Sequence, residues 1–340
     1  MGWFHALQVV EGVCPSARLS DVVEPWFLGG GKASAGGTTF EKDVVVVWTP
    51  KGVAFHETIG DALFAGADGP TKIALVAGRT VDNPKLFRAA IKAGATHVLL
   101  EKPGAPTVAE LEAMAAEAKA ANVPVFMGFI KNIAAYVTDA LAARAKDPGA
   151  TVLLESRNDY TKETLAECFS RNSEGLLKNM AVHELALAAQ FFGMRADNIT
   201  SVDLDADGCE CLTLGGHTDF SRVDFTLFND QGTRVRIKAD RCSGDGCRAV
   251  VAAADGTLLY TRDLVDEAKA KQVQARMKEH PDWLGYLITQ EAEYAKLKEL
   301  CAEHALKGTT PPNVATIEIG IEALKLAEYL TPVIKAKLGA

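Results

Sequence analysis

The sequence has no stretch approaching the ~18 consecutive apolar residues that a membrane-spanning helix needs, and its N-terminus has no basic segment or cleavage site typical of a signal peptide. Positive charge is in the minority, with 36 Lys and Arg against 44 Asp and Glu, a formal net charge of -8. This balance argues against a broad nucleic-acid-binding surface. The seven cysteines form no disulfide framework, so we expect reduced thiols. The sequence predicts a cytoplasmic protein with neither a membrane nor a nucleic acid as its partner.

The 340 residues, 48% of them hydrophobic, are enough for two folded domains. Up to Gly128, strand-like apolar runs alternate with helical patterns, which favours a parallel sheet with helices on both faces. The strands expected here are Ala17–Pro25, Asp43–Trp48 ("DVVVVW"), Lys72–Ala77, Thr96–Leu100 and Val123–Gly128, and the helices are Ala6–Glu11, Pro84–Ala93 and Val108–Ala121.

The pattern changes after Gly128. Thr151–Arg157 begins a region whose later runs, "SRVDFTLFND", "TRVRIKADR", "RAVVAAADG" and "TLLYTRD", alternate with period 2 and are separated by turns. Such runs predict an antiparallel sheet, with helices at Gly175–Phe192, Tyr286–His304 and Ile317–Lys335. The predicted fold is α/β: a Rossmann-type doubly wound parallel sheet in residues 1–128, followed by an α+β domain with a mostly antiparallel sheet in residues 129–340, for substrate binding and dimerisation.

The tripeptide Glu101-Lys102-Pro103 follows a buried strand at its carboxyl end, where ligands of open parallel sheets bind. A lysine held there can polarise a carbonyl or hydroxyl group, or exchange a proton with it. The alternative is a solvated loop lysine before a helix that Thr107 caps, and the local chemistry leaves both open.

The segment "AGRTVDNPKLFRAAIKAGATHVLLEKP" resembles the strand, helix and "EKP" of the glucose-fructose oxidoreductase, inositol dehydrogenase and MocA (Gfo/Idh/MocA) family. The resemblance continues in "VPVFMGFIKN", in "EGLLKNMAVHELALAAQFFG" and in "LKGTTPPNVATIEIGIEALKLAE", in the same order along the chain. It implies an NAD(P)-dependent oxidoreductase that transfers a hydride between nicotinamide and a secondary alcohol or carbonyl of a sugar, polyol or related molecule. Two alternatives remain: an NAD-dependent glycosidase of the same fold, and a non-catalytic ligand sensor.

The resemblance implies a catalytic set of Lys102, His183 and Asn179. Asn179 stands where the family has an aspartate, and an amide orients an imidazole without supplying charge. Asn179 and His183 are four residues apart on one face of the predicted helix, so we expect both to point at one ligand. The alternative is an amphipathic core helix with a satisfied polar histidine.

Several cations near the expected site suggest an anionic small-molecule substrate. The candidate substrate contacts are Lys131, Asn132, Arg157 and Lys178. Each of them has a surface role as its alternative.

The dinucleotide fingerprint is incomplete, because the first strand and first glycine are missing. Glu24, 22 residues after Gly2, favours NAD over NADP because a carboxylate repels a 2'-phosphate. Candidate cofactor contacts are Gly2, Trp3, Phe4, Glu24, Gly78, Arg79, Thr80, Asn83, Glu101 and Lys102. We expect a natural start upstream of Met1, and a gap or a substitute strand between Ala17–Pro25 and Lys72–Ala77, with "DVVVVW" as the only spare strand. No metal site is expected, and a homodimer or homotetramer should form through the C-terminal sheet.

Overall fold

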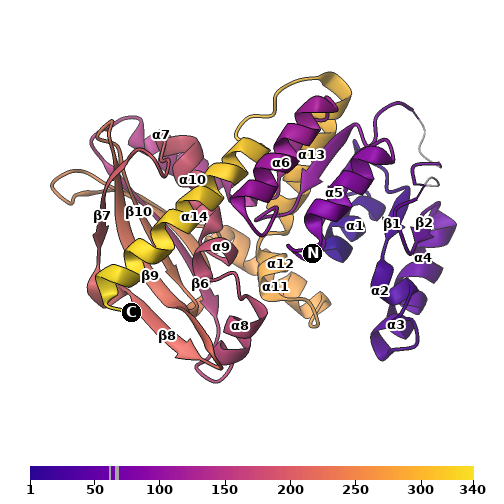
Figure 1. Cartoon of the computed structure of the whole chain (residues 1–340), viewed down its shortest axis with the longest axis horizontal. Helices are drawn as coiled ribbons and strands as arrows, with labels where there is room; N and C mark the ends of the chain where they lie inside the picture. Colours follow the sequence, from indigo (N-terminus) through magenta and orange to yellow (C-terminus); the bar gives the residue numbers. More distant parts are fainter. Residues whose placement is uncertain (61–62, 66–68) are drawn as a thin grey trace. The chain divides into compact units, whose positions relative to one another are not determined.

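The structure is a computed structural model that describes residues 1–60, 63–65 and 69–340. It divides into two compact units (Figure 1). The first comprises Met1–Ala105, Ala109–Gly128 and Tyr294–Pro312, and the second comprises Pro106–Val108, Phe129–Glu293 and Asn313–Ala340. The chain thus passes from one unit to the other at Gly128, where the sequence pattern changes. The segment Tyr294–Pro312, however, returns to the first unit.

The first unit has parallel strands with the connectivity of a Rossmann-type domain. Strands β3 (Ile73–Val76), β4 (His97–Leu100) and β5 (Val125–Met127) pair in that order, and β1 (Asp21–Val23) pairs with β2 (Ala54–His56). The helices are α1 (Gly2–Val10), α2 (Pro25–Leu28), α3 (Ala35–Phe40), α4 (Val46–Trp48), α5 (Asn83–Lys92), α6 (Val108–Ala120) and most of α13 (Glu291–Lys307), with a π-helix at Glu41–Val45 and a 3-10 helix at Thr49–Lys51.

The parallel strands form two separate sheets. Residues Gly2–Val10 are helical, so they supply no conventional first strand. Among the described residues, no strand joins β1 to β3, which is where the sequence predicts a gap or a substitute. The order β2-β1 and then β3-β4-β5 is that of a doubly wound sheet without its central strand.

The prediction of a strand at Asp43–Trp48 is wrong. These residues lie in the π-helix and α4, in one helical stretch from Ala35 to Trp48. Val44 and Trp48, four residues apart, pack into a core cluster, whereas Val46 and Val47 are exposed. Tertiary packing on one helical face therefore overrides the β-propensity of four consecutive valines.

The second unit contains a seven-stranded mixed sheet in the order β12-β11-β6-β10-β9-β7, with β8 paired to β9. Only β6 and β10 run parallel, so the expectation of a mostly antiparallel sheet is confirmed. The strands are β6 (Thr151–Asp159), β7 (Ile199–Leu204), β8 (Glu210–Leu214), β9 (His217–Asn229), β10 (Arg234–Asp240), β11 (Cys242–Ala252) and β12 (Leu258–Asp263).

Helices α7, α8 and α10 of this unit pack against the sheet, and residues Val182–Ala189 of α10 are all buried (Figure 1). On β10, buried and partly exposed residues alternate strictly, as in a sheet with one covered face. The helices are α7 (Ala135–Arg144), α8 (Leu165–Arg171), α9 (Leu176–Asn179), α10 (Val182–Phe192), α11 (Glu267–Glu279), α12 (Gly285–Thr289) and α14 (Ile317–Leu338), with 3-10 helices at Ile130–Ile133 and Ala206–Gly208.

All seven cysteines are free thiols, which agrees with the reduced state expected from the sequence. Within the described residues, no helix is long and apolar enough to cross a bilayer.

Candidate active site

In the first unit, polar residues gather at the carboxyl ends of β3 and β4. Gly78 follows β3 closely, and a side chain there would meet Leu86 Cδ1 at 2.5 Å. The turn then leads to Asn83, which opens α5 and is only 1% exposed. Its Oδ1 is buried without a hydrogen-bond partner. Because buried polar atoms are rarely left unpaired, this oxygen marks a place where a ligand donor fits.

The other two residues of this turn differ from Asn83. The Arg79 guanidinium pairs with Asp82 at 2.8 Å and its side chain is 82% exposed. Thr80 is partly buried. Sequence alone treats Arg79, Thr80 and Asn83 as equivalent candidates, whereas the structure buries only Asn83.

Glu101, at the end of β4, forms a buried pair with His5 of α1, with 2.8 Å between Oε1 and Nε2. Burial by itself would raise the pKa of Glu101, but the hydrogen bond and charge of His5 outweigh it, so this pKa lies below its ordinary value. The pKa of His5 is lowered, mainly by burial. His5 stands where the fingerprint needs its third glycine, so an imidazole and a carboxylate fill the space between helix and sheet.

Lys298 of α13 completes this cluster. Its Nζ donates to Gln8 Oε1 at 2.6 Å and to the Tyr294 carbonyl at 2.9 Å, and it lies 3.2 Å from His5 Nδ1. Burial lowers the pKa of Lys298 to about 8. Sequence reasoning missed Lys298, because nothing local ties α13 to α1.

The remaining cofactor candidates in the first unit differ in their position and exposure. Gly2 opens α1, and a Cβ there would lie 3.8 Å from Ala77 Cβ, beside the end of β3. Trp3 is 41% exposed, whereas Phe4 is fully buried against Tyr294. Phe4 is therefore a core residue, which corrects its expected contact with the cofactor. Lys102 follows Glu101 directly and is partly buried.

Glu24 follows β1 and caps the N-terminus of α2. Its Oε1 accepts from the backbone N–H groups of Trp26 at 2.9 Å and Phe27 at 3.3 Å. The carboxylate is thus fixed at the carboxyl end of a parallel strand, which is where an acid of the dinucleotide fingerprint is required.

In the second unit, the helix predicted at Gly175–Phe192 is two helices. Helix α9 ends at Asn179, and α10 starts at Val182 after a break at Met180 and Ala181. Asn179 and His183 therefore flank a break and do not share the face of one continuous helix. Asn179 Nδ2 donates to Glu174 Oε1 at 3.0 Å, and the His183 ring packs edge-on against Phe129 with centroids 5.7 Å apart.

Glu184, the residue after His183, anchors the first turn of α10. Its Oε1 accepts from Lys131 Nζ at 2.6 Å and its Oε2 from Ser156 Oγ at 3.2 Å. Cys247 lies opposite Ser156 on β11 and interacts with Lys131. All four side chains are buried.

Burial by itself would lower the pKa of Lys131, but Cys247 and Glu184 more than offset it, so its pKa is raised. Lys131, expected to contact the substrate, is instead the cation of a buried ion pair. Sequence reasoning missed Glu184, although its place beside His183 was a usable signal.

The other expected substrate contacts differ in how far their polar atoms are already hydrogen-bonded within the protein. Asn132 is fully buried; its Nδ2 donates to Gln190 Oε1 at 2.7 Å, and its Oδ1 has no hydrogen-bond partner. Lys178 binds Glu328 at 2.8 Å and the Pro106 carbonyl at 3.3 Å, so it serves as a structural tie. Arg157, near the end of β6, has a buried Nε without a hydrogen-bond partner. Its guanidinium packs against Gly246, where a Cβ atom would lie only 2.7 Å from Nη2.

Comparison with known proteins shows what part of the chain is similar to. Residues 41–129 match the model of the Gfo/Idh/MocA family, described as "Oxidoreductase family, NAD-binding Rossmann fold". This match confirms the resemblance found in the sequence over these residues, and the model that they match describes an NAD-binding Rossmann fold. No curated protein matches the chain.

Solved structures share the whole fold. The myo-inositol dehydrogenase of Corynebacterium glutamicum is 18% identical, with a TM-score of 0.66 over 96% of this chain and 90% of that one. The scyllo-inositol dehydrogenase of Lactobacillus casei, solved with NAD(H) and scyllo-inositol, is 14% identical, with a TM-score of 0.69 over 99% and 94%. A UDP-N-acetylglucosamine 3-dehydrogenase of Acidithiobacillus ferrooxidans is 16% identical, with a TM-score of 0.64 over 98% and 94%. These likenesses confirm the predicted fold class.

Proposed function

We propose that the protein is an NAD-dependent dehydrogenase or reductase that interconverts a secondary alcohol and a carbonyl on a sugar, a polyol or a related small molecule. The observation that carries this proposal is the placement of Asn83 and of Glu101-Lys102 at the carboxyl ends of adjacent parallel strands, inside the segment that matches the NAD-binding model. The substrate class follows the inositols and the sugar nucleotide in the names of the structurally similar enzymes.

The residues of the first unit fit a dinucleotide. The buried and unpartnered Oδ1 of Asn83 accepts from the cofactor, and the N-terminus of α1 at Gly2 supplies backbone N–H groups for the pyrophosphate. Glu24 binds the ribose hydroxyls through the oxygen that does not cap α2, which excludes a 2'-phosphate and favours NAD over NADP. When bound, the nicotinamide ring accepts or donates the hydride.

The chain's own residues handle the proton and the substrate oxygen. Lys102 polarises this oxygen, His183 exchanges the proton with it, and Asn179 orients His183 or the substrate. Glu184 keeps the first turn of α10 in place through Lys131 and Ser156, so the backbone that carries His183 is rigid. Arg157, with its buried and unpartnered Nε, is the proposed contact for an anionic substrate group.

The test joins cofactor binding to turnover. NADH binding is measured by fluorescence. Turnover is measured on a panel of polyols, sugars and sugar nucleotides. His183→Asn should lower kcat about 10²–10⁴-fold and leave NADH affinity unchanged, because it removes only the proton exchange. The control Arg171→Gln, on α8, should change neither quantity. Failure of the folded protein to bind NAD(H) would overturn the proposal.

A non-catalytic sensor is the second candidate. Two observations favour it: Asn179 replaces the carboxylate that the family resemblance leads us to expect, and His5 with Glu101 fills the position of the third glycine. The same experiment separates the two functions, because a sensor binds NADH without turning over any substrate in the panel. Asn179→Asp then decides further: an enzyme gains rate or changes its pH profile, whereas a sensor stays inactive.

We infer a cytoplasmic homodimer or homotetramer that associates through the sheet face opposite α10. Charges alternate there across five strands, because Asp224, Lys238, Glu155, Arg248 and Asp263 are successive cross-strand partners. Asp224 and Glu155 are buried, and the side chains of the other three are partly exposed. Such a row suits a polar and specific interface. Light scattering tests this assembly: Lys238→Glu, which places three acids in succession, should shift the mass towards the monomer.

A further inference from the structure

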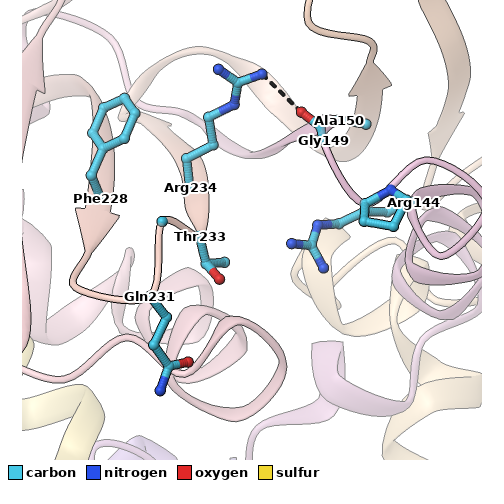
Figure 2. A pocket seen from close by; sticks show the side chains of 9 residues that line it. Arg144, Gly149, Ala150, Phe228, Gln231, Thr233 and Arg234 are labelled. Carbon is cyan, nitrogen blue, oxygen red and sulfur yellow. Dashed lines mark hydrogen bonds between the residues drawn. The ribbon is translucent and has the colours of Figure 1, made fainter.

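A pocket in the second unit lies apart from the residues of the candidate active site. It has a volume of about 480 Å³ and is lined by the turn after α7 and by the turn that joins β9 to β10. Its lining residues are Arg144, Pro148, Gly149, Ala150, Phe228, Gln231, Gly232, Thr233 and Arg234 (Figure 2). Two of them are arginines and none is acidic, which is notable in a chain with a net charge of -8.

The pocket lies at the far end of α10 from His183. The Arg144 guanidinium lies over the Phe192 ring, 5.1 Å from its centroid, and Phe192 ends α10. At 1.5 Å per residue, His183 and Phe192 are about 14 Å apart along the helix. A ligand in this pocket is therefore separate from the proposed chemistry at His183.

The walls of the pocket are preorganised. Asn229 is buried; its Nδ2 donates to the Phe192 carbonyl at 3.2 Å, and its Oδ1 accepts from the backbone N–H groups of Gln231 at 3.2 Å and Thr233 at 2.9 Å. One side chain thus fixes the β9–β10 turn to the end of α10. On the opposite wall, Arg234 Nη2 donates to the Gly149 carbonyl at 2.9 Å (Figure 2).

Arg144 has donor capacity that the protein does not use. Its Nε is buried and has no hydrogen-bond partner. Its guanidinium contacts the Phe192 ring, and α7 ends at this residue. A guanidinium with a donor that the protein leaves unpaired is suited to an oxyanion.

We propose that this pocket binds the phosphate group of a small phosphorylated metabolite. Two guanidinium groups line the pocket and match the charge of a phosphate dianion, and the Thr233 hydroxyl supplies a further donor. The carboxylate of Asp147, beside the pocket, accepts from the Gly149 backbone N–H at 3.1 Å. The volume exceeds the needs of a bare phosphate, and Phe228 offers an apolar surface to the organic part. The proposal rests on this pocket alone and does not depend on the oxidoreductase reaction.

The test measures binding of three probes, inorganic phosphate, glycerol phosphate and malonate, by titration calorimetry at constant ionic strength. Saturating NADH is present so that phosphate cannot occupy a nucleotide site. Glycerol phosphate should bind saturably and more tightly than inorganic phosphate. Both Arg144→Gln and Arg234→Gln should weaken this binding at least about tenfold, and Arg144→Lys should weaken it less, because charge remains but the fork is lost. Arg171→Gln removes the same charge elsewhere and should leave the affinity unchanged.

Three outcomes would overturn the proposal. They are the absence of saturable phosphate binding, an affinity that both pocket substitutions leave unchanged, and tighter binding of malonate than of either phosphate, which would make the ligand a dicarboxylate. If an arginine variant fails to fold, as judged by circular dichroism, Thr233→Val decides in its place. This change keeps the size of the side chain and removes one donor, so it should weaken glycerol phosphate binding while leaving NADH binding intact.

Discussion

Each of the two units buries a lysine in a polar cluster, but the pKa values of the two lysines shift in opposite directions. Lys131 in the second unit has a carboxylate oxygen of Glu184 at 2.6 Å, and its pKa is raised. Lys298 in the first unit contacts an amide oxygen, a carbonyl and an imidazole, and burial lowers its pKa to about 8. The carboxylate of that cluster, Glu101, is already bonded to His5.

The difference shows that the groups close to a buried lysine, and not its depth of burial alone, set the direction in which its pKa shifts. The two lysines are similarly buried, at 6% and 5% exposed. Cys247 and Glu184 more than offset the desolvation of Lys131, whereas the groups around Lys298 do not offset its desolvation. The second unit therefore holds a permanent ion pair beside His183, whereas the first holds a group that can titrate near neutral pH.

The largest expected effect comes from breaking the ion pair. Glu184→Gln leaves the Lys131 ammonium buried without an anion and should lower the free energy of unfolding by about 3–5 kcal/mol. Denaturant titrations measure this loss. The double variant Lys131→Met with Glu184→Gln should recover most of it, because no unpaired charge remains. A loss below about 1 kcal/mol in the single variant would show that the pair does not anchor the first turn of α10.

A smaller, pH-dependent effect is expected for Lys298. Its pKa is about 8 in the folded protein and near 10.5 in the unfolded chain, so the unfolded chain binds more protons between these values. Lys298 therefore contributes stability that rises from about pH 8 to pH 10.5. Thermal unfolding across this range should show the rise, and Lys298→Met should flatten it.

Lys296 provides a matched control for this second prediction, because it lies on the same helix and is exposed. Lys296→Met should leave the rise of stability with pH intact. An equally steep rise in Lys298→Met would assign the titration to another group.

The smallest effect is expected at an exposed ion pair. Arg88 lies 2.7 Å from Glu117, a separation close to that of Lys131 and Glu184, but both side chains are more than 40% exposed. Arg88→Ala should change the free energy of unfolding by less than ~1 kcal/mol, and added salt should reduce the difference. A change as large as that of Glu184→Gln would show that burial does not set the strength of these ion pairs.

Much of the fold was predictable because its signals are local. The apolar runs of β3, β4 and β5 and the period-2 alternation of β9 to β12 are visible in the sequence, and the structure has strands there. The strand predicted at Asp43–Trp48 failed because its residues also carry a helical i, i+4 pattern, which local propensity cannot rank against β-branching. The helix over Gly175–Phe192 was correct in extent, but the break at Met180 carries no Gly or Pro signal.

The sequence predicted where the candidate site residues lie along the strands, but not which side chains they pair with. The position of Glu101-Lys102 at a strand end follows from the sequence pattern. The sequence could not distinguish Asn83, which is buried with a free acceptor, from Arg79, which lies on the surface. It also could not show that Lys131 and Lys178 are engaged by Glu184 and Glu328, since 53 and 150 residues separate these pairs along the chain.

The sequence by itself determined the class of this protein: the order of its strands and helices, the strand-end tripeptide and the family resemblance are all encoded in neighbouring residues. The tertiary structure decided how each polar side chain is used, because burial and pairing depend on residues far apart in the chain. It joined His5, Glu101 and Lys298 into one cluster, and Lys131, Glu184 and Ser156 into another. It also assembled the arginine-lined pocket from two turns that no sequence motif connects.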